Sequence, residues 1–196
     1  MIFSINASRL AWILAKVFKY HSPQSCIGMK RVLVLGNSGS GKSSFAEKLA
    51  DKLGIPCIHL DSHYWKPNWV ATPEEKWPFI VRQLIDRDEW VMDGNYSSTL
   101  EERMQRADTA IYLRVRRPVA IWRVMKRRIV HHGKARAELA EGCYEKIDLD
   151  FLKWIWNHPK RAKRGTFPIL EKYSNSEKIV IYLDSKEAQE FLDSVA

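Results

Sequence analysis

The sequence predicts an α/β fold in which helices cover both faces of a parallel sheet. Three observations lead to this prediction. Short apolar runs alternate with segments of helical periodicity, the first run is apolar without interruption, and a glycine-rich loop joins it to the first helix. Uninterrupted apolar runs are typical of strands buried on both faces, and strands that alternate with helices form parallel sheets. The length of 196 residues suits one domain with a substantial core.

Five apolar runs are expected to form strands, with helices between them. The runs cover residues 31–35, 56–60, 90–92, 109–113 and 178–183. A helix is predicted over 42–53, where the apolar stripe stops at Gly54. A second is predicted from residue 72 to about 87, because Thr72-Pro73-Glu74-Glu75 has the pattern of a capping box. The longest helix is predicted after Pro118.

The stretch GNSGSGKS, residues 36–43, matches the pattern G-x-x-x-x-G-K-[S/T] between a predicted strand and a predicted helix. Its glycines allow positive φ angles and a close backbone approach, so that N–H groups form an anion nest at the helix N-terminus. We therefore expect the loop to bind ATP, with Lys42 on the β- and γ-phosphates and Ser43 on Mg²⁺. The expected nucleotide-binding residues are Gly36, Asn37, Ser38, Gly39, Ser40, Gly41, Lys42, Ser43 and Ser44.

Two carboxylates are expected at the carboxyl ends of neighbouring strands, where ligands bind in parallel sheets. Asp93 ends the third predicted strand and is expected to hold the Mg²⁺ through water. Asp61 ends the second, where it would act on an acceptor as a general base or an orienting group. Alternatively, Asp61 caps a turn and Asp93 begins an Asp-Gly turn.

Residues 114–136 are rich in lysine and arginine and contain no acid. Arg123 and Arg127 are four residues apart and share a helix face, so we expect them to act in catalysis by stabilising charge on a transferred phosphoryl group. The alternative is a solvated basic helix or a contact with nucleic acid. Lysines and arginines near residue 160 are further candidates for phosphate contacts.

Aromatic residues cluster after the second predicted strand. They are expected to stack on a base, to wall an acceptor pocket, or to pack in the core. The members are His63, Tyr64, Trp65, Trp69 and Trp77.

The formal charge of +9 favours polyanionic partners without choosing among them. The three cysteines form no Cys-x-x-Cys pair, which favours a reducing cytoplasm. Residues 1–28 are expected to be an extension outside the core. Their apolar run over residues 10–18 is too short to span a bilayer, and membrane association is not expected. The alternative is an amphipathic helix that lies on a membrane surface.

From Met29 onward the chain resembles the adenylate-kinase-related P-loop proteins named DNA topology modulation proteins. The resemblance lies in HLDSHYWKPNW, WVMDGNYSSTLEERMQRADTAIYLRVRRP, WRVMKRR and EGCYEKIDLDFLKWIWN. It implies a nucleoside-monophosphate-kinase-like fold, with a five-stranded parallel sheet in the order 2-3-1-4-5. It also implies a small helical lid over about residues 123–150.

The resemblance also implies roles for single residues. Asp93 matches the magnesium-site aspartate of the Asp-Gly pair in adenylate kinases, and Arg123 and Arg127 match the arginines that begin the lid. In adenylate kinases the pair continues with an aromatic residue, a proline and an arginine that binds the acceptor phosphate, whereas this chain has Asn95-Tyr96-Ser97.

The missing arginine makes an ordinary nucleoside monophosphate a doubtful acceptor, although Arg82 or Arg103 could replace the lost cation. Asp61 resembles an aspartate that small-metabolite kinases of this fold place against an acceptor hydroxyl. The leading expectation is an ATP- and Mg²⁺-dependent phosphotransferase acting on a small acceptor, a nucleotide or a hydroxylated metabolite. The alternatives are a nucleic-acid-associated ATPase and a non-catalytic nucleotide sensor.

Overall fold

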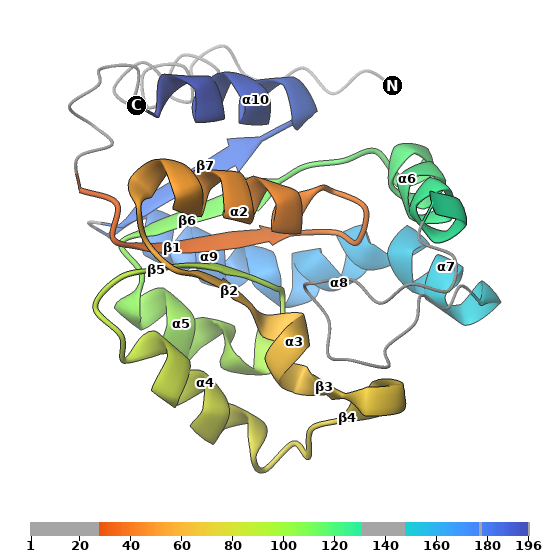
Figure 1. Cartoon of the computed structure of the whole chain (residues 1–196), viewed down its shortest axis with the longest axis horizontal. Helices are drawn as coiled ribbons and strands as arrows, with labels where there is room; N and C mark the ends of the chain where they lie inside the picture. The colour runs from red at the N-terminus through yellow and green to blue at the C-terminus, as the bar shows by residue number, and fades with distance from the viewer. Residues whose placement is uncertain (1–27, 131–147, 177, 196) are drawn as a thin grey trace.

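A five-stranded sheet lies between two layers of helices in the computed structural model, which describes residues 28–130, 148–176 and 178–195 (Figure 1). Its strands are ordered β2-β5-β1-β6-β7 and each neighbouring pair is parallel. Numbered by their sequence within this sheet, the strands follow the predicted order 2-3-1-4-5. Their bounds are Arg31–Gly36 for β1, Cys57–His59 for β2, Trp90–Asp93 for β5, Thr109–Leu113 for β6 and Ile179–Leu183 for β7.

The central strand β1 shows why this sheet needs helices on both faces. Val32 and Val34 pack on one face of the sheet, and Leu33 and Leu35 pack on the other. All four side chains are fully buried, as expected for a strand with four apolar residues in succession. The first face is covered by α2 (Lys42–Leu53) and α10 (Ser185–Ser194), the second by α4 (Trp77–Ile85), α5 (Leu100–Arg106), α8 (His158–Arg164) and α9 (Thr166–Ser174).

Two further helices lie beyond the carboxyl ends of the strands (Figure 1). They are α6 (Arg117–Val130) and α7 (Leu149–Trp156), and buried Ala120, Val124 and Ile155 pack between them. The helix α6 is the longest among the described residues and begins one residue before Pro118, close to the predicted start. This arrangement brings α6 and α7 to the edge of the sheet where β1, β2 and β5 end.

The capping box predicted at Thr72 does not form. The hydroxyl of Thr72 donates to the Tyr64 carbonyl at 2.7 Å, and α4 begins only at Trp77. The Thr72 side chain therefore bonds to the preceding segment, and it does not cap the helix as the local pattern predicted.

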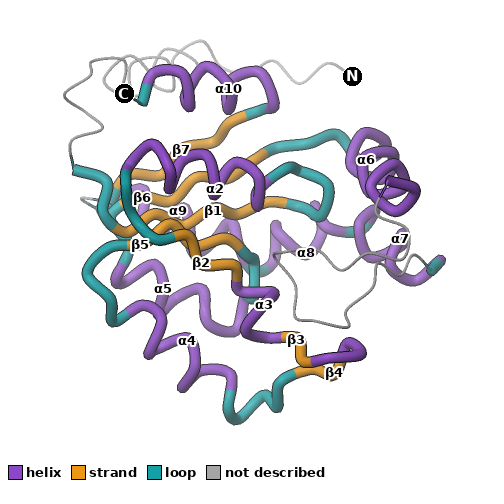
Figure 2. The backbone as a smooth tube through the Cα atoms, in the orientation of Figure 1, coloured by secondary structure: helices purple, strands orange, loops and turns teal. Residues whose placement is uncertain are grey.

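The segment between β2 and α4 forms a helix and a small hairpin that the sequence did not predict (Figure 2). The helix is α3 (Leu60–Tyr64), and the antiparallel strands are β3 (Trp65–Lys66) and β4 (Val70–Ala71) around a tight 3-10 turn. The prediction that Asp61 ends a strand is wrong, because β2 stops at His59 and Asp61 lies in the first turn of α3.

Parts of two predictions fall outside the described residues. These are residues 1–27 of the expected N-terminal extension and residues 131–147 of the expected lid. Within the described ranges, the first lid residues belong to α6 and the last to α7. No helix in the described part of the chain is both long and apolar enough to cross a membrane.

Candidate functional site

The loop between β1 and α2 has the backbone that a phosphate cradle requires. Gly36, Gly39 and Gly41 have φ angles of 150°, 78° and 87°. A Cβ at Gly39 would lie 2.4 Å from the Ala120 carbonyl oxygen of α6, whereas a Cβ at Gly41 would meet nothing within 4 Å. The helix α2 begins at Lys42, and no side chain caps its first N–H groups. Open space at Gly41 and uncapped N–H groups fit the phosphates of a nucleotide.

The predicted magnesium residues lie together. The Ser43 hydroxyl donates to Asp93 Oδ2 at 2.8 Å, and Asp93 is buried at the end of β5. Mg²⁺ prefers oxygen ligands and keeps several waters and substrate phosphates in its shell. The pair therefore fits an ion held directly by Ser43 and through water by Asp93. Among the residues that the structure describes, no cluster of three or more His, Cys, Asp or Glu side chains forms a separate metal site.

A histidine that the sequence did not single out also contacts Asp93. His59 Nδ1 lies 2.5 Å from Asp93 Oδ1, and His59 Nε2 lies 3.4 Å from Glu47. Burial acts to lower the pKa of His59, but hydrogen bonds to Asp93 and Cys57 and the charges of both groups raise it to about 10. His59 is therefore an imidazolium at neutral pH and balances the buried charge of Asp93. The parallel register that pairs His59 with Asp93 is the signal that could have revealed it.

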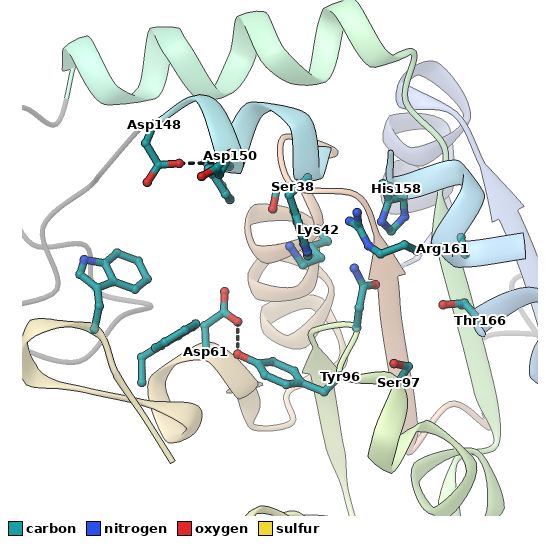
Figure 3. Close-up of a pocket in the computed structure, with 16 residues that line it drawn as sticks. Ser38, Lys42, Asp61, Tyr96, Ser97, Asp148, Asp150, His158, Arg161 and Thr166 are labelled. Carbon is teal, nitrogen blue, oxygen red and sulfur yellow. Dashed lines mark hydrogen bonds between the residues drawn. The ribbon is translucent and has the colours of Figure 1, made fainter. Parts of the chain in front are cut away.

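A cavity of about 820 Å³ lies beside the phosphate loop (Figure 3). Lys42 enters it from the first turn of α2 and Asp61 from α3. The other walls come from the hairpin after α3, from the segment after β5, and from α7, α8 and the start of α9, and most of the lining surface is apolar. The structure thus brings the predicted phosphate-binding lysine and the predicted acceptor carboxylate to one space.

The carboxylate of Asp61 is held by a tyrosine that sequence reasoning did not assign. Tyr96 Oη donates to Asp61 Oδ1 at 2.6 Å (Figure 3). The Tyr96 ring packs against Tyr64 and Trp77, with centroid distances of 4.8 Å in both cases. Burial and the nearby Asp61 charge raise the pKa of Tyr96, so its hydroxyl stays a donor. One oxygen of Asp61 is engaged in this way, and the other can accept from a ligand.

The aromatic cluster divides between the cavity lining and the core. Trp65 and Trp69 line the cavity, whereas Trp77 is buried in the core with Tyr64 packed against it. Trp154 of α7 closes the cavity from the other side. A ligand in the cavity would therefore meet aromatic surfaces on two walls.

The two arginines assigned to catalysis lie on α6, outside the cavity lining. Arg123 Nη1 is 3.5 Å from the carbonyl oxygens of both Gly39 and Ser40, and its Nη2 is 3.1 Å from Ser185 Oγ. Arg123 thus contacts the backbone of the phosphate loop. Arg127 follows one helical turn later, and a catalytic role for either arginine stays a prediction.

Neither arginine suggested as a replacement cation is placed for that role. Arg82 pairs with Glu102 at 2.8 Å on the surface, and the fully buried Arg103 donates to backbone carbonyls. Among the described residues, the cations that line the cavity are Lys42 and Arg161 of α8, and the guanidinium carbon of Arg161 is 4.2 Å from the Trp154 ring centroid. Arg161 belongs to the basic residues near residue 160, so composition indicated the region but not the residue.

His158 also lines the cavity, and nearby cations affect its pKa. Burial lowers its pKa, and the charges of Arg161 and Lys42 lower it further, to about 4. Its Nε2 lies 3.0 Å from the Tyr112 hydroxyl. Lys42 and Arg161 thus place positive charge beside His158, whereas Asp148 and Asp150 place negative charge in the part of the lining that comes from the start of α7.

Comparisons with known proteins show the fold but not a family. No family model matches the chain. Threonine synthase-like 1 of Mus musculus is 37% identical over 57 residues, which are 29% of this chain and only 8% of that protein's length. Adenylate kinase of Mycobacterium marinum is 28% identical over 166 residues, covering 76% of this chain and 89% of the kinase.

Two solved shikimate kinases share the architecture. The enzyme from Bacteroides thetaiotaomicron aligns with a TM-score of 0.52 and 18% identity, covering 85% of this chain and 96% of its own. The enzyme from Acinetobacter baumannii, solved in complex with shikimate, aligns with a TM-score of 0.53 and 14% identity, covering 88% and 94%. These two alignments and the sheet order show that the chain has the three-layer α/β fold of P-loop kinases. The narrower resemblance to DNA topology modulation proteins stays a prediction.

Proposed function

We propose that this chain is a phosphotransferase that moves the γ-phosphate of ATP, with Mg²⁺, to a hydroxyl group of a small acceptor. The observation that carries the proposal is the single cavity that Lys42 and Asp61 both line. A nucleotide held by the loop would direct its γ-phosphate toward the space that Asp61 faces. The fold shared with adenylate and shikimate kinases supports the same class of reaction.

In the proposed reaction the acceptor oxygen attacks the γ-phosphorus, the bond from that phosphorus to the β–γ bridging oxygen breaks, and ADP leaves. Asp61 accepts the hydroxyl proton, and Tyr96 keeps the carboxylate oriented through its 2.6 Å hydrogen bond. Lys42 stabilises charge on the phosphoryl oxygens. Mg²⁺ at Ser43 and Asp93 would supply further neutralisation of the phosphates.

Charge favours a hydroxyl at Asp61 over a phosphate. A carboxylate accepts a hydrogen bond from a hydroxyl, whereas it repels an anion at the same distance. Arg161 lines the same cavity and could receive a negatively charged group elsewhere on the acceptor. The aromatic walls suit an acceptor with an apolar or planar body. Together these features favour a small hydroxylated metabolite over an ordinary nucleoside monophosphate.

The test is ADP release from Mg·ATP across panels of nucleoside monophosphates, nucleosides, sugars and hydroxylated carboxylic acids. We expect one of the hydroxylated classes to stimulate ADP release, and Lys42→Ala to abolish it because the phosphates lose their cation. Lys186→Ala, which changes an exposed lysine of α10, is the matched control. If Lys42→Ala binds and turns over ATP like the parent chain, the nucleotide site has been assigned to the wrong loop.

The same assay separates the two alternative functions. The net charge of +9 is consistent with a nucleic-acid-associated ATPase. Duplex DNA should stimulate such a protein, with an affinity that falls steeply as salt rises. A non-catalytic sensor should bind ATP and release no ADP with any acceptor. Stimulation by DNA alone would replace the small-molecule proposal.

A further inference from the structure

The segment after β5 contacts the phosphate loop through Asn95 and the predicted acceptor carboxylate Asp61 through Tyr96. The contact of Asn95 explains how the phosphate loop is held. Asn95 Nδ2 donates to the Gly36 carbonyl at 2.8 Å, and the Gly36 N–H donates to Asn95 Oδ1 at 3.1 Å. Gly36 is the first residue of the loop, where the chain turns away from β1 with a φ of 150°. One side chain therefore satisfies both backbone groups of the residue at which the cradle begins.

The sheet register explains why a side chain is needed there. On one side of β1 the ladder with β6 reaches Gly36, which pairs with Leu113. On the other side the ladder with β5 ends where Val34 pairs with Asp93. Among the residues that the structure describes, no strand runs beside Gly36 on that second side. A carboxamide carries the same donor and acceptor as a peptide group. The Asn95 side chain thus continues the ladder where the backbone of β5 has turned away.

A buried arginine fixes the segment that presents Asn95. Arg103 is fully buried and donates from Nη1 to the Gly94 carbonyl at 2.9 Å and from Nη2 to the Asn95 and Tyr96 carbonyls. Tyr96 has a φ of 29°, which side-chain-bearing residues rarely adopt. Such a conformation persists only where its surroundings enforce it. The three carbonyl contacts provide that enforcement.

We propose that Asn95 is a positioning residue for ATP, which presets the phosphate loop through Gly36 and is itself set by Arg103. This inference rests on the proposed function, because it assumes that the loop binds ATP. Without the Asn95 carboxamide, Gly36 would lose the partners of its N–H and carbonyl on that side. The loop would then sample other conformations, and ATP would have to order it on binding. Tyr96 of the same segment donates a hydrogen bond to Asp61. Arg103 therefore fixes a segment that contacts both the proposed nucleotide site and the proposed acceptor site.

The test measures binding of a fluorescent ATP analogue, mant-ATP with Mg²⁺, to the full chain and its variants. We expect Asn95→Ala to weaken affinity by about tenfold, the factor that corresponds to one to two ordinary hydrogen bonds. Arg103→Lys should also weaken it, although Arg103 does not line the cavity. Asn175→Ala, which changes an exposed asparagine after α9, should bind as the parent chain does.

Thermal melting without nucleotide distinguishes positioning from a purely structural role. A variant Asn95→Ala that melts earlier but binds mant-ATP as tightly as the parent would overturn the inference, and so would one unchanged in both measurements. If Arg103→Lys does not fold, mant-ATP binding by Asn95→Ala alone tests the inference. A parent chain that binds no mant-ATP would overturn the proposed function and the inference with it. A parent that binds while Asn95→Ala binds equally well would overturn the inference alone.

Discussion

Replacing Gly39 by alanine tests how closely α6 approaches the phosphate loop. The φ of 78° at Gly39 lies in the left-handed region, where a residue with a Cβ pays about 1–2 kcal/mol. The added Cβ would also lie 2.4 Å from the carbonyl oxygen and 3.0 Å from the carbonyl carbon of Ala120. Both atoms belong to the backbone of α6 and cannot rotate away. Overpacking of this kind costs about 1–3 kcal/mol, so we expect Gly39→Ala to lower the free energy of unfolding by about 2–5 kcal/mol in total.

Gly54 offers a matched control for the conformational part of that cost. It ends α2 with a φ of 67°, and a Cβ there would meet nothing within 4 Å. The Gly54→Ala variant should therefore lose only the left-handed penalty of about 1–2 kcal/mol. The difference between the two variants isolates the contact between the loop and α6.

The assay is urea denaturation of both variants and the parent chain, with mant-ATP binding measured in parallel. We expect Gly39→Ala to have the lower unfolding midpoint and also to lose ATP affinity, because the loop must move away from α6. Gly54→Ala should keep its affinity for ATP. Equal losses of unfolding free energy in the two variants would show that α6 does not press on the loop, and the described packing of the cradle would be wrong.

Three further predictions concern single side chains at the site. Asp61→Asn should keep mant-ATP affinity but suppress ADP release with the acceptor; a loss of ATP binding with unchanged acceptor affinity would move Asp61 to the metal site. Tyr96→Phe should lower kcat/KM for the acceptor by about tenfold. In an Asp61→Asn background the same change should lower kcat/KM little further, because the hydroxyl acts through that carboxylate. Additive losses of kcat/KM in a double-mutant cycle would contradict this. Burial lowers the pKa of His59 but contacts with Asp93 raise it overall from 6.5 to about 10, so its stabilising charge is fully present below pH 6.5 and is lost as the pH rises toward 10. The parent chain should lose more unfolding free energy than His59→Gln over that range, and parallel stability curves would show that His59 does not titrate there.

The sheet and the phosphate loop could be predicted because their signals are local. Residues 32–35 are apolar without interruption, and the loop that follows carries its own glycines, lysine and serines. The contact between Ser43 and Asp93 was also predictable, because carboxyl ends of parallel strands meet at one edge. These inferences need only the strand pattern and the direction of pairing.

Other features depend on contacts between distant segments. Thr72 has the local pattern of a helix cap, yet its hydroxyl donates a hydrogen bond to the Tyr64 carbonyl. Arg161 reaches the cavity only because α8 folds back over the sheet, and Arg103 points into the protein although its sequence context is that of a surface helix. Composition cannot distinguish a basic side chain that lines a cavity from one that braces a loop.

The contact between Asn95 and Gly36 depends on where one strand ends relative to another. Had β5 continued alongside β1, a backbone would pair with Gly36 and no carboxamide would be needed at residue 95. The same early ending lets the chain turn, so that Tyr96 reaches Asp61 where adenylate kinases continue their Asp-Gly pair toward a phosphate-binding arginine. Ser97 stands at the position of that arginine, and Tyr96, one residue earlier, orients Asp61 through its hydroxyl. Under the proposed function, a carboxylate oriented at this place favours a hydroxyl over a phosphate. The departure from the adenylate kinase pattern and the proposed class of acceptor would then have one structural cause.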